Sequence, residues 1–124
     1  MSHIKSFRDL NVWNKGIQLV CDLYKITNKY PKEEIYGIVS QMQRAAVSIP
    51  SNIAEGATRK SKKEYYRFVS ISYASSAELE TQIEISKRLN YINQDEYIRM
   101  LKEIIEIQKI LFKLRESFKD KIII

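Results

Sequence analysis

Residues that break regular structure are scarce in this sequence, and their scarcity limits the possible fold more than any other feature. Only three glycines and two prolines occur among 124 residues. An all-β fold of this size needs many tight turns, which depend on glycine and proline. The sequence therefore predicts an all-α fold. A chain of this length suits a single domain, residues 1–124, with one core.

Four helices are predicted from capping residues and from apolar residues at spacings of three and four. The first begins near Ser6 and ends before Tyr30-Pro31, and the second runs from that proline to Gly56. The third opens with a capping-box pattern, Ser61-Lys62-Lys63-Glu64, which Asn93-Gln94-Asp95-Glu96 repeats for the fourth. Because the connections are short, neighbours must be antiparallel, which predicts an up-down-up-down four-helix bundle.

Each helix carries an apolar stripe that is predicted to face the core. The stripes of the first two helices are Leu10, Trp13, Ile17, Val20 and Tyr24, and then Ile35, Val39, Met42, Ala46, Ile49 and Ile53. The fourth helix has a second stripe at a seven-residue interval, Ile98, Ile105 and Phe112. One stripe suffices for a bundle, so the second predicts an oligomer interface, with a broad core face as the alternative.

The second predicted helix contains a proline in its interior. Pro50 removes one backbone hydrogen bond and its ring clashes with the Ala46 carbonyl, so a kink at Pro50 is expected. A polar seam is predicted on the face opposite the apolar stripe, bonded across a helix or subunit contact to acids of the third helix. Its residues are Arg44, Ser48, Asn52 and Glu55, with Glu78 and Glu80 as the acids. A ligand site is the alternative.

Several short motifs follow one another along most of the chain. They are Phe7-Arg8-Asp9-Leu10, Val12-Trp13, Pro31-x-x-Glu34, Gln41-x-x-Arg44-Ala45-Ala46, the run SIPSNIAEG from Ser48 to Gly56, and Glu78-Leu79-Glu80-Thr81-Gln82. Together they resemble the bacterial four-helix bundle family of 23S rRNA intervening-sequence proteins. One departure is Tyr73-Ala74-Ser75-Ser76, where that family commonly has a Gly-Ser pair.

The resemblance implies an assembly as well as a fold. It implies a ring-shaped homopentamer of four-helix bundles, related to the accessory variability proteins of diversity-generating retroelements. Those relatives are basic pentamers that bind nucleic acid and a reverse transcriptase. No settled biochemical activity comes with the family name.

Five cations surround one acid, Glu64, at the start of the third predicted helix, in a chain of net charge +6. The field of a helix N-terminus disfavours cations, but its free N–H groups together with cations suit a phosphate. Neighbouring tyrosines are placed to stack on an unpaired base. The predicted nucleic-acid-binding residues are Arg59, Lys60, Lys62, Lys63, Tyr66 and Arg67. The alternatives are a solvated surface and a protein or lipid partner.

Few residues suit catalysis. His3 is the only histidine, and Cys21 is the only cysteine, expected to be buried as a small apolar residue of the first stripe. Neither a phosphate-loop motif nor a Glu-x-x-His pair occurs. The sequence therefore predicts no enzymatic activity, no metal and no cofactor.

No apolar run approaches the length of a membrane span, and the N-terminus lacks a signal peptide's apolar stretch. We therefore expect a cytoplasmic protein without a membrane partner. The pattern does not decide whether the apolar tail Ile122-Ile123-Ile124 is frayed or docked.

Combined, these features predict a non-enzymatic, oligomeric bundle that binds nucleic acid, with RNA favoured over DNA. The alternative is a protein–protein scaffold, or an accessory factor for a polymerase or reverse transcriptase, to which nucleic acid is incidental.

Overall fold

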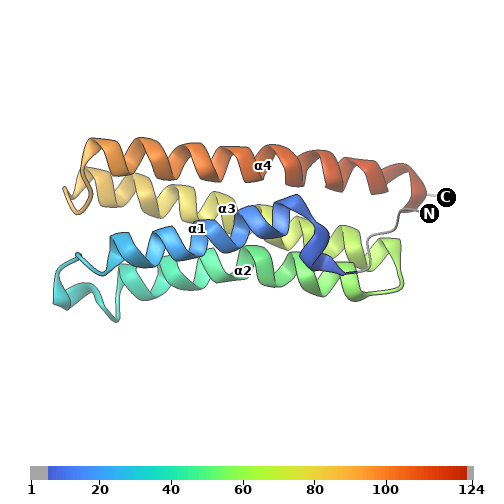
Figure 1. Ribbon diagram of the computed structural model, residues 1–124, viewed down its shortest axis with the longest axis horizontal. Helices are drawn as coiled ribbons and strands as arrows, with labels where there is room; N and C mark the ends of the chain where they lie inside the picture. Colours follow the sequence, from blue (N-terminus) through green and yellow to red (C-terminus); the bar gives the residue numbers. More distant parts are fainter. Residues whose placement is uncertain (1–5, 123–124) are drawn as a thin grey trace.

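The computed structural model describes residues 6–122, which form an antiparallel bundle of four long helices (Figure 1). Two short 3-10 helices precede the first and second of them. The elements are η1 (Phe7–Asp9), α1 (Asn11–Thr27), η2 (Lys32–Glu34), α2 (Ile38–Thr58), α3 (Lys62–Arg88) and α4 (Gln94–Ile122). The predicted all-α, up-down-up-down architecture is confirmed.

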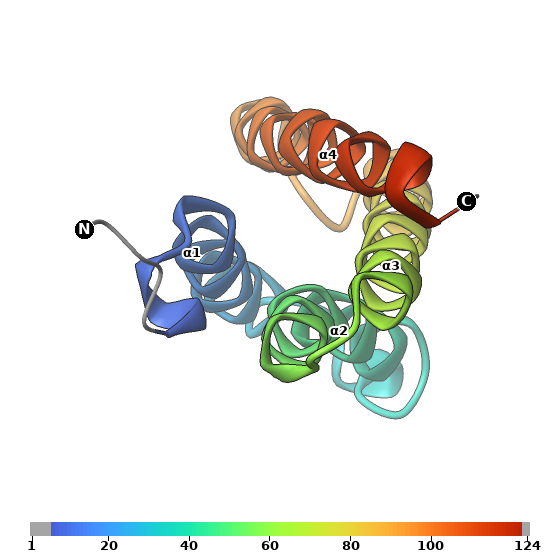
Figure 2. The same cartoon turned by 90° about the vertical axis from the view of Figure 1, so that its right-hand side faces the viewer.

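The helices contact one another in ring order, α1 with α2, α2 with α3, α3 with α4, and α4 with α1 (Figure 2). The contact between α2 and α3 is the most extensive, and that between α1 and α4 is the least. All four helices supply fully buried side chains, among them Leu19, Leu23, Met42, Ile49, Ile53, Leu79, Ile83, Met100, Ile104 and Leu111. No helix within residues 6–122 is long and apolar enough to cross a lipid bilayer.

The first helix starts later than predicted. Ser6 does act as a cap, but for η1, where its Oγ accepts from the Arg8 N–H at 3.1 Å. Leu10 then has an extended backbone, and the Asn14 side chain donates to its carbonyl oxygen at 3.1 Å. These local bonds hold a turn before α1, so the helix begins only at Asn11.

Both predicted ends of the second helix are wrong. η2 follows Pro31, and Gly37 has a non-helical backbone with φ −109° and ψ −118°, so α2 begins at Ile38. At the other end, α2 continues past Gly56 to Thr58. A Cβ on Gly56 would lie 2.9 Å from the Phe68 Cβ, so this glycine is needed for the close approach of α3 and does not end the helix.

The predicted core face of α1 is confirmed only in part, because Leu10, Trp13 and Val20 pack against the core but are only partly buried. Ile17 and Tyr24 are exposed, whereas Leu19, Leu23 and Ile26 are buried. Both sets recur at spacings of three and four, and the prediction chose the set one position out of phase. Cys21 was placed by the same error, and it is exposed.

The stripe predicted for α2 is confirmed from Val39 to Ile53. Ile35 is exposed, because it lies in the turn before α2. Pro50 is buried and α2 runs unbroken through it; the kink stays a prediction. A Cβ on Gly16 would lie 3.2 Å from the Pro50 Cβ, so α1 crosses α2 closely at this proline.

Both predicted N-caps that follow are present. Ser61 Oγ accepts from the Glu64 N–H at 3.2 Å at the start of α3. Asn93 and Glu96 form the reciprocal pair of a capping box before α4, with bonds of 2.8 and 3.0 Å. His3 and residues 123–124 lie outside the described residues.

Candidate nucleic-acid interface

The predicted cationic residues lie at the turn between α2 and α3, at the end of the bundle where α1 begins and α4 ends (Figure 1). We call this surface the basic corner; it comprises Arg59, Lys60, Lys62, Lys63, Tyr66 and Arg67. Its arginines and lysines are all exposed, and Tyr66 is half-buried. The short turn holds the six residues within a few positions of the α3 N-terminus.

The two arginines of the basic corner are paired with carboxylates. Arg59 Nη2 lies 2.9 Å from a Glu55 carboxylate oxygen, one turn earlier on α2. Arg67 places Nε and Nη2 each 3.3 Å from the Glu64 carboxylate. Both guanidinium groups also lie over the Phe68 ring, at 5.0 and 4.5 Å. These contacts give the arginines a structural role that the sequence prediction did not include.

Glu64 remains ionised among these cations. The hydrogen bond from Arg67 lowers the pKa of its carboxyl, and the charges of Arg67, Arg59 and Lys63 lower it further. Glu64 therefore serves as the fixed counter-ion of the corner.

The three lysines differ from the arginines. Among the described side chains, those of residues 6–119, no hydrogen bond or ion pair engages Lys60, Lys62 or Lys63. The five cations of the basic corner and the two carboxylates bonded to its arginines, those of Glu55 and Glu64, together carry a net charge of +3. These lysine ammonium groups are the part of the corner free to meet an anion.

The two neighbouring tyrosines have different environments. The Tyr65 ring packs on Phe118 with centroids 4.7 Å apart, and burial raises the pKa of its hydroxyl. Tyr66 instead lines a shallow groove of about 520 Å³ on the outer side of α3. The residues around this groove are Lys63, Glu64, Tyr66, Arg67, Ser70, Ile71 and Ala74. Only Tyr66 therefore has its ring at a surface hollow.

The structure brings together only part of the predicted polar seam. Ser48 Oγ lies 2.8 Å from Ser75 Oγ, and Asn52 donates to Ser48 Oγ at 2.8 Å. Ser75 was not among the predicted partners, although small polar residues recur along the buried side of α3. The hydroxyl groups of Ser48 and Ser75 therefore join α2 to α3, and the Asn52 amide is bonded within α2.

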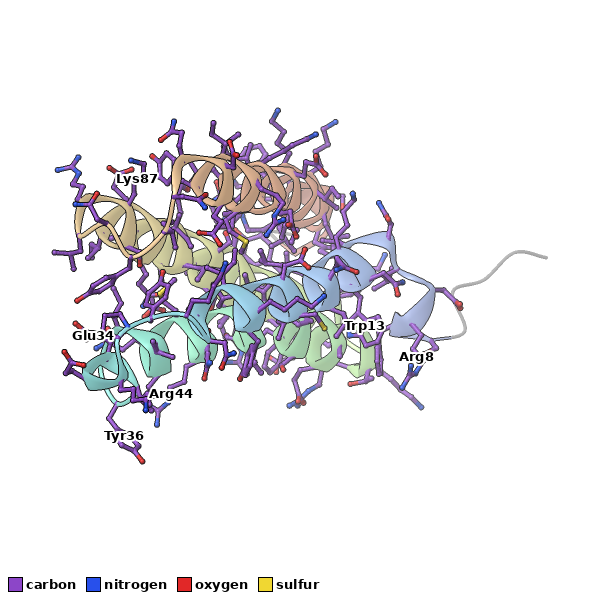
Figure 3. The ribbon with its side chains drawn as sticks, turned by 60° about the vertical axis from the view of Figure 1, so that its left-hand side comes forward. Arg8, Trp13, Glu34, Tyr36, Arg44 and Lys87 are labelled. Carbon is purple, nitrogen blue, oxygen red and sulfur yellow. The ribbon has the colours of Figure 1, made fainter. Side chains whose placement is uncertain are left out.

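The charged residues predicted for the seam lie elsewhere. Arg44 projects outward from α2 (Figure 3), and Glu78 is exposed on α3. Glu55 is bonded to Arg59, and Glu80 accepts from Gln108 of α4 at 2.9 Å. Glu78 and Glu80 are therefore not bonded to the polar residues of α2 that were predicted as their partners.

Comparison with known proteins places the chain in a family. The sequence profile of the 23S rRNA-intervening sequence proteins matches residues 8–113. The chain belongs to this family. The match includes the whole of the basic corner and all but the last residues of α4.

A solved structure supports the fold of this family member. The crystal structure of a protein of unknown function from the S23 ribosomal protein family, from Bacteroides thetaiotaomicron, superposes with a TM-score of 0.75. It is 23% identical in sequence, and the alignment covers 84% of this chain and 97% of that one. No curated protein matches the chain.

In this 23S rRNA-intervening sequence protein, the second stripe of α4 is on the surface. Ile98 is 54% exposed, Phe112 46% and Ile105 38%. Ile105 and Phe112 also line a groove of about 370 Å³ between α3 and α4, together with Tyr73. Ile105 and Phe112 therefore present apolar side chains at one surface groove, and adjoining apolar side chains of this kind can mark an interaction site.

A cluster of ionisable residues that the sequence did not indicate lies between α1 and α4. Asp22 and Glu103 line a cavity of about 290 Å³, with Lys15 bonded to Glu106 at 3.2 Å on its rim. Burial, and then the hydrogen bond and charge of Asp22, raise the pKa of Glu103 to about 7. No group of three or more potential ligand side chains in the described part of the chain is arranged to hold a metal ion.

Proposed function

We propose that this protein is a non-enzymatic, oligomeric bundle that binds nucleic acid, most readily RNA, through the basic corner. One observation carries the proposal: Lys60, Lys62 and Lys63 stand exposed with no carboxylate partner among the side chains of residues 6–119, beside arginines that each have one. Cations at a helix N-terminus oppose the field of the helix, and bound phosphates would remove that cost.

The different roles of the arginines and the lysines in the basic corner support phosphate binding. Arg59 and Arg67 fix the turn through Glu55, Glu64 and Phe68, so the lysines extend from a rigid base. Lysine is a point charge with a flexible stem, which suits phosphate contacts that do not depend on base sequence. In the proposed oligomer the corner is repeated in each subunit, and linked contacts on one strand raise the overall affinity.

The test is the binding of a fluorescent single-stranded RNA, followed by anisotropy at two salt concentrations. We expect the logarithm of the affinity to fall with a slope of roughly −0.7 per phosphate contacted. Lys62→Glu with Lys63→Glu should abolish binding without loss of helix content by circular dichroism. The matched control, Lys25→Glu with Lys32→Glu, makes the same change of charge, from +6 to +2, at exposed positions of the opposite end.

Two outcomes would contradict the proposal. One is an affinity that does not change between low and physiological salt. The other is an equal loss of binding in both variant pairs, because net charge and not the corner would then account for the attraction.

A second candidate function is a protein–protein scaffold or an accessory factor for a polymerase or reverse transcriptase, and the exposed stripe Ile98, Ile105 and Phe112 favours it. The same stripe is the proposed subunit interface. A homopentamer of this 14.6 kDa chain would have a mass of about 73 kDa. Light scattering alongside the RNA experiment measures this mass. The mass of a single chain would contradict the subunit interface, and the stripe would then favour contact with another protein.

A further inference from the structure

The groove beside Tyr66 has a chemistry unlike that of the lysines next to it. Ile71, 37% exposed, and Ala74 supply apolar surface, and the Tyr66 ring lines the same hollow. Lys63, Glu64 and Arg67 also line it, and because Glu64 is bonded to Arg67, Lys63 is the cation beside the apolar surface that has no bonded acid among the described side chains. An apolar hollow bordered by an aromatic ring and an ammonium group matches the two parts of a nucleotide.

We infer that this groove receives one unpaired base of a single-stranded nucleic acid, with Lys63 at the adjacent phosphate. The inference rests on the proposed function and narrows it from nucleic acid in general to single strands. Every base has a π-face, so stacking on Tyr66 needs no particular sequence. A duplex keeps its bases stacked inside and presents mainly its backbone to such a surface.

The neighbouring aromatic residues do not suit this role. The Tyr65 ring packs on the Phe118 ring, with centroids 4.7 Å apart. Phe68 lies beneath the guanidinium groups of Arg59 and Arg67 and is 9% exposed. Tyr66 is therefore the aromatic ring of the corner that a base can reach.

Charge complementarity favours a strand of nucleic acid over an apolar partner in the groove. Three lysines that bond to no side chain of residues 6–119 stand within six positions of Tyr66, on the side toward the turn. A strand that placed one base in the groove would carry its neighbouring phosphates past these ammonium groups. An apolar peptide would leave them without counter-ions.

The experiment measures binding of one RNA sequence as a single strand and as a duplex, and of the matching DNA strand. Tyr66→Ala should weaken single-strand binding at least about fivefold and leave duplex binding unchanged, because only the unpaired base loses its stacking partner. Tyr66→Phe should bind as the wild type does, because it keeps the ring. The DNA strand shows whether the loss is common to both nucleic acids or confined to RNA.

The control is Tyr36→Ala, since Tyr36 is 97% exposed and points away from the bundle far from the corner (Figure 3). Equal losses for single strand and duplex, or no loss in Tyr66→Ala, would overturn the base site. If the base site fails in this way but Lys62→Glu with Lys63→Glu abolishes binding, the proposed function stands without a base site. If that lysine variant also binds as the wild type does, the proposed function itself fails.

Discussion

The contact between α2 and α3 and the contact between α1 and α4 each join two antiparallel helices, but by different means. Between α2 and α3, small residues let the helices approach, with Gly56 against Phe68 and Ser48 against Ser75. Between α1 and α4, long ionisable side chains meet around a cavity, and the contact is the least extensive of the ring.

The difference separates two ways of holding a bundle together. A close contact between small residues tolerates almost no added volume, because neighbouring backbones limit how far it can relax. A contact lined by carboxylates tolerates changes of shape but responds to proton concentration. The first contact should therefore be sensitive to steric changes and the second to pH.

The largest effect is expected at Gly56. Gly56→Leu should lower the free energy of unfolding by about 3 kcal/mol, because even its Cβ would lie 2.9 Å from the Phe68 Cβ. Gly56→Ala should destabilise less, since alanine favours the helix by about 1 kcal/mol over glycine. Urea unfolding followed by circular dichroism measures both.

Gly16→Ala is the matched comparison. The added Cβ would lie 3.2 Å from the Pro50 Cβ, so this contact between α1 and α2 is looser than the contact at Gly56. Gly16→Ala should destabilise less than Gly56→Ala. The reverse order would show that the α2–α3 contact is not the tighter one.

An intermediate, pH-dependent effect is expected at Glu103. Its pKa is raised from 4.5 to about 7 in the folded protein, so the folded state keeps a proton that the unfolded state loses between these values. Stability should fall as pH rises through this window and stay low above it. Glu103→Gln should therefore be more stable than wild type by about 2 kcal/mol at pH 8, less than the full shift implies because solvent screens this partly exposed side chain, and little different below pH 4.5.

Glu106→Gln serves as the comparison for that pH series, because the Glu106 charge is the smallest of the contributions that shift the pKa of Glu103. It removes the partner of Lys15 from a pair whose side chains are 38% and 44% exposed, so it should cost less than about 1 kcal/mol. A pH profile of unfolding that is the same for wild type and Glu103→Gln would remove the distinction between the two contacts.

The smallest effect is expected at Ser72. Its buried hydroxyl donates to the Ile49 carbonyl at 2.9 Å across the α2–α3 contact, so Ser72→Ala should cost about 1 kcal/mol. Ser51→Ala, at an exposed position of α2, should lower the melting temperature by less than half as much as Ser72→Ala does. Equal shifts in the melting temperature would mean that this hydrogen bond contributes nothing specific.

The two contacts also differ in how well the sequence predicts them. The buried stripe of α2 and the caps at Ser61 and Asn93 follow from local spacing, and the structure confirms them. The face of α1 does not, because two apolar sets satisfy the same periodicity and only packing selects between them. The nearness of Asp22 to Glu103 depends on how far α1 and α4 are offset along the bundle, which no local pattern encodes.

The basic corner was predicted in position but not in detail. Glu55 and Arg59 are four residues apart, a spacing that forms ion pairs on a helix. The sequence prediction ends the second helix at Gly56, which puts Arg59 outside the helix and does not predict its pairing with Glu55. The structure continues α2 to Thr58 and brings the two together at 2.9 Å.

Cys21, the single cysteine of the chain, is exposed on α1. A maleimide dye would therefore attach at one defined position per polypeptide without any engineered substitution. The number of photobleaching steps from an immobilised particle then equals its number of labelled chains, which gives a direct stoichiometry for the assembly, provided the thiol stays accessible within it.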